Sequence, residues 1–425
     1  MKSLSILKEI TQNHNIYIVG GFIRDYLMGN KSKDIDLVVM SNVENIVDEF
    51  TKRINNKRII LDEVRGIYRV ITDSNIFIDF SNPVGQDLFQ DLGCRDFTCN
   101  SIAVKLNEIK LEENEYYLDK EKMIDPFGGI NDIENRVLKM VHRNFVKEDP
   151  ARILRAYRFS NNLDFDIENE TANIINNNIK LIKTIKNERI KVELIKMFDN
   201  RLNNKTLEKF LNSGIIIYLF NVNTYKKRNK KEILLKQNNY ILQKQLLQNC
   251  TLKNYIFNLS QLFLHPIIKG EVTVEEIEDL LINYTFNKKD IKTIKDHLWS
   301  SKMVIKNIVV YKNRDYLIYQ DLFNKNIDPE TIKSLLLSYT ESTNIDLGIK
   351  NDLIDIVEKF KIMKKRTSPK LIDGDQIQDI LDLGESKIIG DILEEIRRRR
   401  ALGLLKSKEE IYDYLENTFN KRNKS

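Results

Sequence analysis

The spacing of apolar residues changes along the chain at about residue 130. Before that point, short β-rich apolar runs alternate with helical segments. These runs begin at Ile16, Ile35, Arg69, Asn75 and Asn100. After that point the apolar residues recur at helical spacing, and few prolines interrupt them. The pattern predicts an α+β fold, with a small head built on a mixed sheet and a long all-helical remainder.

Two polar stretches divide the helical remainder. The basic run YKKRNKKE, from Tyr225, is typical of a loop or surface turn, and KIMKKRTSPK, from Lys361, precedes a separate last block. We expect a catalytic head followed by a helical neck, body and tail. Their ranges are 1–135, 136–200, 201–360 and 361–425.

The composition is typical of a protein from a reducing compartment. Lys and Arg number 68 and Asp and Glu 62, a net charge of +6, so a polyanion would be bound by local patches. The cysteines Cys94, Cys99 and Cys250 form no CxxC pair and no metal-ligand spacing. No apolar run is long enough to cross a bilayer, and no secretory segment is recognisable. We expect a cytoplasmic protein without a membrane partner.

Two aspartates stand one residue apart in the apolar run DIDLVV. On a strand, Asp34 and Asp36 project from the same face and repel each other, while Ile35 faces the other way. A solvated strand edge would explain an isolated pair of this kind. The apolar surroundings favour a divalent cation that compensates both charges, and Asp79 in NIFIDF could complete the set. Carboxylates that hold Mg²⁺ at a sheet edge suit nucleotidyl transfer.

A glycine turn precedes this strand. The chain contains neither GxGxxG nor GxxxxGK[ST], so the common dinucleotide and P-loop fingerprints are excluded. The bare amides of Gly20 and Gly21 could approach a phosphate, and a helix is expected to start at Arg24 and Asp25.

Further segments follow in a fixed order: DLGCRDFTCNSIAV, DPFGG, EDPARILRAYRFSNNLDF and ERIKVEL. Together with GGFIRDYLMG and DID, the series resembles the class II tRNA nucleotidyltransferases, the family of CCA-adding enzymes and bacterial poly(A) polymerases. The resemblance covers roughly the first 200 residues. A block around Gly374, Gly384 and Gly390 is similar to the tail of that family.

The resemblance implies nucleotide contacts in the first two motifs. Gly20, Gly21 and Arg24 belong to the glycine motif. In the family pattern RRDFTxNA the conserved side chains contact the sugar and triphosphate. Arg95, Asp96 and Asn100 match that pattern, but Cys94 replaces its first arginine and removes one cation.

The EDxxR motif suggests base selection. Glu148, Asp149 and Arg152 are expected on the first turn of a helix, where Asp149 and Arg152 share a face. A carboxylate accepts from the amino group of cytosine or adenine, and a guanidinium donates to the adjacent ring acceptors. The resemblance implies that Glu148 orients the pair. An isolated EDPAR would be read as an ordinary salt bridge.

Other charged residues follow the EDxxR motif. Arg155 and Arg158 are either phosphate contacts or ion pairs on a helix surface. Glu188, Arg189 and Glu193 are expected to brace the neck rather than touch the substrate.

The body and tail carry no separate catalytic signal. His265 is followed by Pro266 and lacks the cluster of ligands that a metal phosphohydrolase needs. Basic runs from Lys226 and Lys364 are either RNA contacts or solvated lysines. The run from Arg397 to Arg400 can pair with Glu394 and Glu395 or face RNA.

The motifs together predict template-independent addition of nucleotides to the tRNA 3′ end, with Mg²⁺ as cofactor and CTP, or CTP and ATP, as substrates. The alternatives are a poly(A) polymerase, a non-catalytic RNA-binding module and a phosphohydrolase. Between Asp79 and Arg95 the chain has one tight turn and a short helix. The resembled family usually has a longer loop there in enzymes that complete CCA. We therefore expect a CC-adding enzyme, with the terminal adenosine left to a separate A-adding enzyme.

Overall fold

The computed structural model describes most of the chain. The described residues are 2–12, 14–72, 75–112, 115–199, 203–219, 255–268, 272–310, 328–343, 347–383 and 387–419. They belong to two compact units, and each unit is described by itself. The first contains Met1–Met197 and Lys205–Leu219, and the second contains Phe198–Asn204 and Phe220–Ser425.

The head is built on a seven-stranded sheet with the order β3-β4-β5-β2-β1-β6-β9. Its strands are β1 (Ile16–Val19), β2 (Asp34–Val39), β3 (Arg58–Asp62), β4 (Ile67–Ile71), β5 (Phe77–Ser81), β6 (Ala103–Lys105) and β9 (Met123–Ile124). Strands β2 and β5 are parallel, and the other neighbours are antiparallel. The mixed-sheet head is therefore confirmed.

The five expected strands are all present, and β3 and β9 add to them. Two further short strands, β7 (Lys110–Glu112) and β8 (Glu115–Tyr117), form a separate hairpin. Tyr116 of this hairpin packs against Phe22 and Tyr26 of helix α2, with ring centroids 4.8 and 5.8 Å apart.

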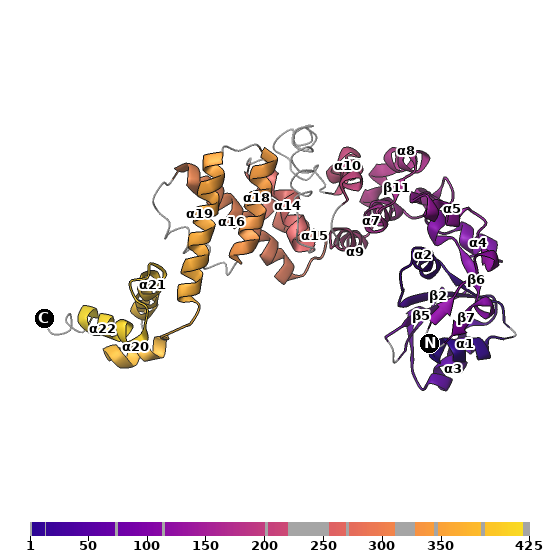
Figure 1. The fold of residues 1–425 in the computed structure, drawn as a ribbon, viewed down its shortest axis with the longest axis horizontal. Helices are drawn as coiled ribbons and strands as arrows, with labels where there is room; N and C mark the ends of the chain where they lie inside the picture. The colour runs from indigo at the N-terminus through magenta and orange to yellow at the C-terminus, as the bar shows by residue number, and fades with distance from the viewer. Residues whose placement is uncertain are drawn as a thin grey trace. The chain divides into compact units, whose positions relative to one another are not determined.

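Helices cover and border this sheet (Figure 1). Helix α3 (Val43–Ile54) begins at an Asn42 cap and buries Val47 and Phe50, and the Phe50 ring lies 5.7 Å from that of Phe80 in β5. The other head helices are α1 (Lys2–Ile10), α2 (Gly21–Leu27) and α4 (Leu88–Gly93). The predicted start of α2 at Arg24 was three residues late, because Gly20, at a φ of 74°, already serves as the N-cap.

Short helices follow the head in the first unit. They are α5 (Gly129–Glu134), α6 (Phe145–Glu148), α7 (Arg152–Leu163), α8 (Asn169–Asn178), α9 (Asn187–Phe198), α10 (Asn204–Asn212) and α11 (Ile215–Leu219). The expectation that EDxxR forms one helical turn was wrong. Helix α6 ends at Glu148, Asp149 is extended, and α7 begins at Arg152. Pro150 explains the break, because a residue before proline is sterically driven out of the helical region.

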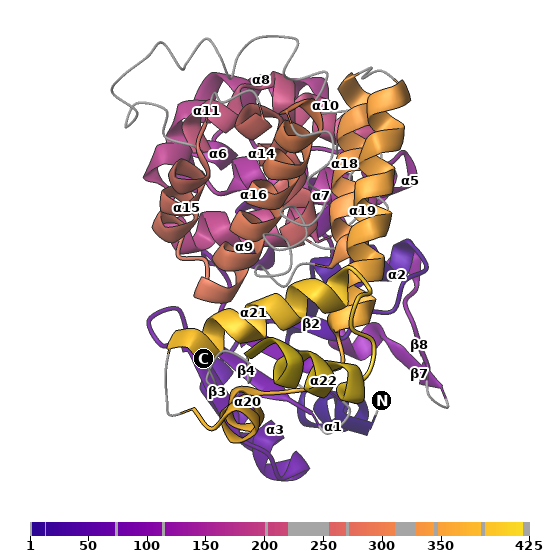
Figure 2. The ribbon, with the colours of Figure 1, turned by 90° about the vertical axis from the view of Figure 1, so that its left-hand side faces the viewer.

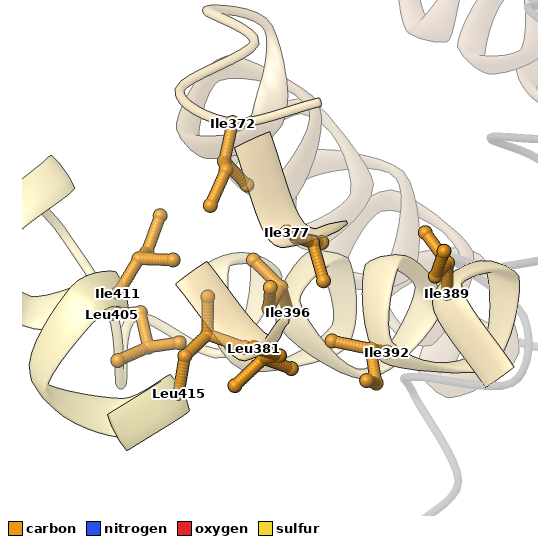
Figure 3. Close-up of a cluster of buried hydrophobic side chains, with 9 residues drawn as sticks. All are labelled: Ile372, Ile377, Leu381, Ile389, Ile392, Ile396, Leu405, Ile411 and Leu415. Atoms are coloured by element: carbon orange, nitrogen blue, oxygen red, sulfur yellow. The ribbon is translucent and has the colours of Figure 1, made fainter. Parts of the chain in front are cut away.

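The described elements of the second unit are all helices. It contains α14 (Tyr255–Ile268), α15 (Val274–Asn283), α16 (Lys288–Val310), α18 (Pro329–Thr343) and α19 (Leu347–Thr367), and Figure 2 shows the last two side by side. Three tail helices follow: α20 (Gly374–Leu381), α21 (Lys387–Ala401) and α22 (Lys408–Phe419). Nine buried side chains of these helices and of the segments beside them, among them Ile377, Ile396 and Leu415, form one hydrophobic core (Figure 3).

Candidate active site

A polar pocket of about 510 Å³ lies in the first unit. It collects charges of both signs from the head and from the helices that follow it. Its lining is Gly20, Gly21, Phe22, Arg24, Asp25, Ser32, Asp34, Asp36, Arg95, Asp96, Asn100, Asp149, Arg152, Arg155, Arg158, Phe159 and Lys196. Every predicted site residue except Asp79 and Glu148 is in this lining.

The Gly20 turn brings backbone close to charged side chains. A Cβ atom at Gly20 would lie 2.9 Å from a guanidinium nitrogen of Arg95 and 3.8 Å from an Asp36 carboxylate oxygen. Gly20 also has a φ of 74°, which favours glycine. The glycine turn therefore keeps open the space between Arg95 and Asp36.

The predicted carboxylates lie on neighbouring strands. Asp34 and Asp36 are exposed to the pocket from β2, whereas Ile35 is buried beneath them, as alternation predicts. Asp79 of β5 pairs in register with Asp36. Both of its oxygens are bound by Arg69, a partner the sequence did not suggest. Within the described ranges, no three His, Cys, Asp or Glu side chains lie close enough together to hold a metal ion by themselves.

The carboxyl group of Asp36 has a raised pKa. Surrounding protein raises its pKa above the ordinary value, Arg95 opposes that rise, and the charges of Asp79 and Asp34 add to it. A nearby cation stabilises the ionised form of a carboxylate that is partly removed from water and lies beside other carboxylates. Hard oxygen donors of this kind fit a divalent ion.

Asp96 is a buried member of the pocket lining that connects two segments. It is 7% exposed and accepts from the side chain of Asn100 at 3.0 Å and from the Phe97 N–H at 2.9 Å. Arg155 of α7 donates to its other oxygen. Burial alone would raise the pKa of Asp96, but the Arg155 charge and these hydrogen bonds hold it below the ordinary value. The residue therefore stays ionised and joins the CRDFT segment to α7.

Asn100 extends this network to the glycine helix. Its side-chain oxygen accepts from Arg24 of α2 at 2.6 Å. Arg24 also donates to the adjacent Asp25 at 2.6 Å, so its guanidinium is held between two partners at the pocket wall. Arg24 of the glycine motif and Asp96 and Asn100 of the CRDFT motif are thus joined by hydrogen bonds.

The DPFGG motif supports the segment that carries Asn100. The Asp125 carboxylate accepts from the backbone N–H groups of Gly129 and Ile130, at 2.7 and 2.8 Å, and thereby caps α5. A Cβ atom at Gly129 would lie 2.1 Å from the Thr98 carbonyl oxygen, so no other residue fits. The close approach packs α5 directly against the segment that carries Asn100.

The predicted base-reading pair lies in the pocket wall. Arg152 donates to the carbonyl of Phe145 at 3.2 Å and to Glu148 at 3.4 Å, and it also donates to the carbonyl of Cys94. Glu148 thus contacts Arg152, as the family resemblance implies. The exposed Cys94 contributes its backbone to the site, and its side chain is absent from the lining.

Asp149 is held by Arg189 rather than by Arg152. Arg189 of α9 donates to it at 2.7 Å, and its other oxygen accepts from the Ala151 N–H at 3.1 Å. Burial alone would raise the pKa of Asp149, but Arg189 and the Ala151 N–H bring it below the ordinary value. Spacing in the sequence could not reveal this partner, because it lies 40 residues away.

Arg155 and Arg158 form ion pairs at the pocket, and a phosphate contact stays a prediction. Each lines the pocket, and each is paired with Glu193 of α9, at 3.6 Å for Arg155 and 2.5 Å for Arg158. Glu193 is 8% exposed. Its contacts join α9 to α7, which is the kind of brace the sequence suggested.

The remaining sequence candidates that the structure describes lie outside the pocket. In α21, Arg397 pairs with Glu394, while Arg398 and Arg399 pair with Glu395, at 2.6 to 2.7 Å. The side chain of His265, Gly384 and the basic run from Lys226 lie outside the described residues. No helix in the described part of the chain is both long and apolar enough to cross a membrane.

Two family models match the chain. Residues 16–139 match the poly A polymerase head domain, which covers the sheet and the CRDFT and DPFGG motifs. Residues 164–223 match a model described as the probable RNA and SrmB-binding site of polymerase A. The resemblance inferred from the motifs is confirmed by both.

The curated relatives differ in how much of each protein aligns with this chain. A CC-adding tRNA nucleotidyltransferase of Geobacter sulfurreducens is 35% identical over 184 residues, which is 43% of this chain and 40% of that protein. A CCA-adding enzyme of Ligilactobacillus salivarius is 26% identical over 430 residues, 96% of this chain and 94% of that protein. The chain thus spans less than half of the first relative and nearly all of the second.

Solved structures confirm the fold. The CCA-adding enzyme of Thermotoga maritima complexed with tRNA superposes with a TM-score of 0.70 at 22% identity, covering 98% of this chain and 93% of that one. The mixed-sheet head followed by helical regions is therefore a known arrangement.

Proposed function

We propose that this chain, whose residues 16–139 belong to the poly A polymerase head-domain family, is a tRNA nucleotidyltransferase that adds cytidylate to the RNA 3′ end without a template. The observation that carries the proposal is the pocket itself. Its lining contains Asp34 and Asp36 together with Asp149 and Arg152. Phosphate chemistry and base selection are thereby available within one cavity.

The reaction is attack by the terminal ribose hydroxyl on the α-phosphate of CTP, with pyrophosphate as the leaving group. Asp34 and Asp36 would hold Mg²⁺, which offsets phosphate charge and lowers the pKa of the attacking hydroxyl. Arg24 and Arg95 border the same space, and their guanidinium groups suit triphosphate oxygens. Asp79 supports this strand as the in-register neighbour of Asp36.

Base selection follows from ionisation and geometry. With its pKa lowered, Asp149 is an acceptor only, so it can accept from the amino group of cytosine or adenine. Uracil and guanine present a carbonyl oxygen at the equivalent position, which a carboxylate repels. Arg152, anchored through Cys94 and Glu148, would donate to the ring acceptors beside that amino group.

The short connection after β5 favours an enzyme that stops at two cytidines. Only residues 82–87 separate β5 from α4, so little chain is free to reshape the pocket for ATP. The CC-adding name of the Geobacter relative agrees with this reading. A full CCA-adding activity is the second candidate, because the relative that matches over 94% of its length has that name.

The test is product length on a tRNA that ends at the discriminator base, with CTP and ATP offered separately and together. We expect two added cytidines under both CTP conditions, and a terminal adenosine only after a separate A-adding enzyme is supplied. Three added nucleotides would establish the full CCA activity instead. Growth of a long tail from ATP alone on unrelated RNA would indicate a poly(A) polymerase. RNA binding without incorporation would indicate a non-catalytic module.

The proposed partners are tRNA, CTP and the A-adding enzyme, and the proposed location is the cytoplasm. Among the first relatives, the solved Thermotoga maritima enzyme is complexed with tRNA. The neck over 136–200 would select the base, and the tail over 361–425 would contact tRNA. A truncation that ends after Thr367, at the end of α19, tests the tail because it should weaken tRNA binding more than CTP binding.

A further inference from the structure

Three charged residues form a row across the head sheet. Arg69 of β4 pairs in register with Asp79 of β5, and Asp79 pairs in register with Asp36 of β2. Residues in register on neighbouring strands project from the same face of a sheet. The row therefore runs from Arg69 to the carboxylate that faces the pocket.

Arg69 engages both carboxylate oxygens of Asp79. Its Nε donates to Oδ1 and its Nη2 donates to Oδ2, both at 2.7 Å. The two side chains are 35% and 20% exposed, so solvent weakens the pair only in part. The guanidinium also lies 5.4 Å from the centroid of the Phe77 ring, which further limits its movement. A bidentate arrangement of this kind is strong and directional.

The pairing leaves the two carboxylates of β2 as the open ligands. Asp34 and Asp36 line the pocket and Asp79 does not. A hard divalent cation takes about six oxygen ligands, and its affinity rises with the number of charged ligands. Two carboxylates alone therefore form a weak site, and the phosphate oxygens of a nucleotide could supply what is missing.

We propose that Arg69 is a positioning residue that keeps Asp79 out of the ligand set, so that the cation binds well only together with the nucleoside triphosphate. The proposal rests on the function proposed above. By occupying Asp79, Arg69 also limits repulsion among three neighbouring carboxylates. The metal site is then completed by the substrate, which prevents the free enzyme from holding the ion tightly.

The experiment measures binding of Mn²⁺ to the full chain by electron paramagnetic resonance, without nucleotide. In Arg69→Met the freed Asp79 should tighten Mn²⁺ binding about tenfold, because a third charged ligand becomes available. The double variant Arg69→Met, Asp79→Asn should return to the wild-type affinity. Asp79→Asn alone should change the affinity less than about twofold, because Asp79 is not a ligand while Arg69 holds it.

The matched control is Arg58→Met. Arg58 also binds two carboxylates, those of Glu44 and Asp48, but they belong to α3 rather than to the pocket. Its loss should leave Mn²⁺ affinity unchanged. Circular dichroism checks that each variant is folded, and the Asp79→Asn measurement remains decisive if Arg69→Met does not fold.

Two results would overturn the proposal. One is unchanged or weaker Mn²⁺ binding in folded Arg69→Met, and the other is a tenfold loss in Asp79→Asn alone. Failure of the underlying function gives a different result. In that case Asp34→Asn and Asp36→Asn would bind Mn²⁺, with CTP present, as well as the wild type does.

Discussion

The pocket and helix α21 both contain several arginines paired with acids. The pocket has local pairs, such as Arg24 with Asp25, and also pairs between distant segments, whereas the pairs described within α21 are local. In the pocket, Arg155 and Asp96 are 59 residues apart and belong to different elements. In α21, Arg398 pairs with Glu395 one turn away on the same helix. A long-range pair fixes the relative positions of two segments, whereas a local pair fixes only a side chain.

The consequence of breaking a pair should differ in the same way. Loss of Arg155 leaves Asp96 buried without its counter-ion, whereas loss of Arg398 leaves the partly exposed Glu395 with Arg399 as its partner. The pairs of Arg398 and Arg399 with Glu395 should therefore cost less to break. Those of the pocket are part of its construction, and the predictions below test this contrast.

The largest effect is expected from the carboxylates of β2. Asp36→Ala or Asp34→Ala should lower CTP incorporation about a thousandfold, because several kcal/mol of metal-dependent transition-state stabilisation are lost. Affinity for tRNA should be retained, since phosphate contacts come from basic residues. Asp48→Ala on α3 is the control. Near-normal turnover of either β2 variant in Mg²⁺ would refute the metal assignment.

The free energy of unfolding should distinguish the pocket from helix α21 most directly. Arg155→Met should lower the free energy of unfolding by about 3 kcal/mol, as expected for a buried partner left unpaired. Arg398→Met should change it by less than about 1 kcal/mol. Urea denaturation followed by circular dichroism measures both. Equal losses would show that reach along the chain does not decide the strength of these pairs.

Nucleotide choice should respond to the base-reading pair. Asp149→Ala and Arg152→Ala should each broaden nucleotide choice, since a good bidentate base contact gives about 1–3 kcal/mol of discrimination. Arg189→Met should also broaden nucleotide choice, but by less, because Asp149 keeps its hydrogen bond from the Ala151 N–H. Competition of CTP with UTP and GTP measures this. Slower variants with unchanged preference would mean that these residues do not read the base.

The smallest effects should appear in the pH dependence of stability. The lowered pKa of Asp96 contributes stability above the ordinary carboxyl pKa, and this contribution is lost as the pH falls through the folded-state pKa. The raised pKa of Asp36 acts with the opposite sign, because ionised Asp36 destabilises the folded state at neutral pH. Asp96→Asn should therefore destabilise at pH 7 and Asp36→Asn should stabilise. Unfolding curves between pH 3 and 7 would contradict this if both variants shifted in one direction.

The sequence predicted the parts of the site that depend on local periodicity. Alternation placed Asp34 and Asp36 on one face with Ile35 buried, and the motifs placed Arg95 and Asn100 beside them. The strand β3 was missed because its apolar run, Ile59 to Leu61, does not alternate. All three residues are exposed. Such short runs do not distinguish strand from helix.

The errors and omissions concern tertiary partners and one local rule. The sequence did not reveal the partners of Arg69 and Arg189, because the contacts with Asp79 and Asp149 are fixed by strand register and by helix packing. The prediction of one helical turn over EDxxR was wrong for a reason visible in the sequence, because Pro150 restricts the backbone of the residue before it. The domain boundaries and the tRNA contacts of the tail stay predictions.

The register between β2 and β5 has a consequence for changes in chain length. Asp36 lies opposite Asp79 because the two strands are aligned residue by residue, with Ile78 and Phe80 on the buried side. Deleting one residue from β5 would turn every following side chain to the other face. A carboxylate would then enter the core and an apolar group would replace it beside Asp36. Insertions and deletions in this strand should therefore be tolerated less well than most substitutions, even where the residues that are gained or lost carry no function of their own.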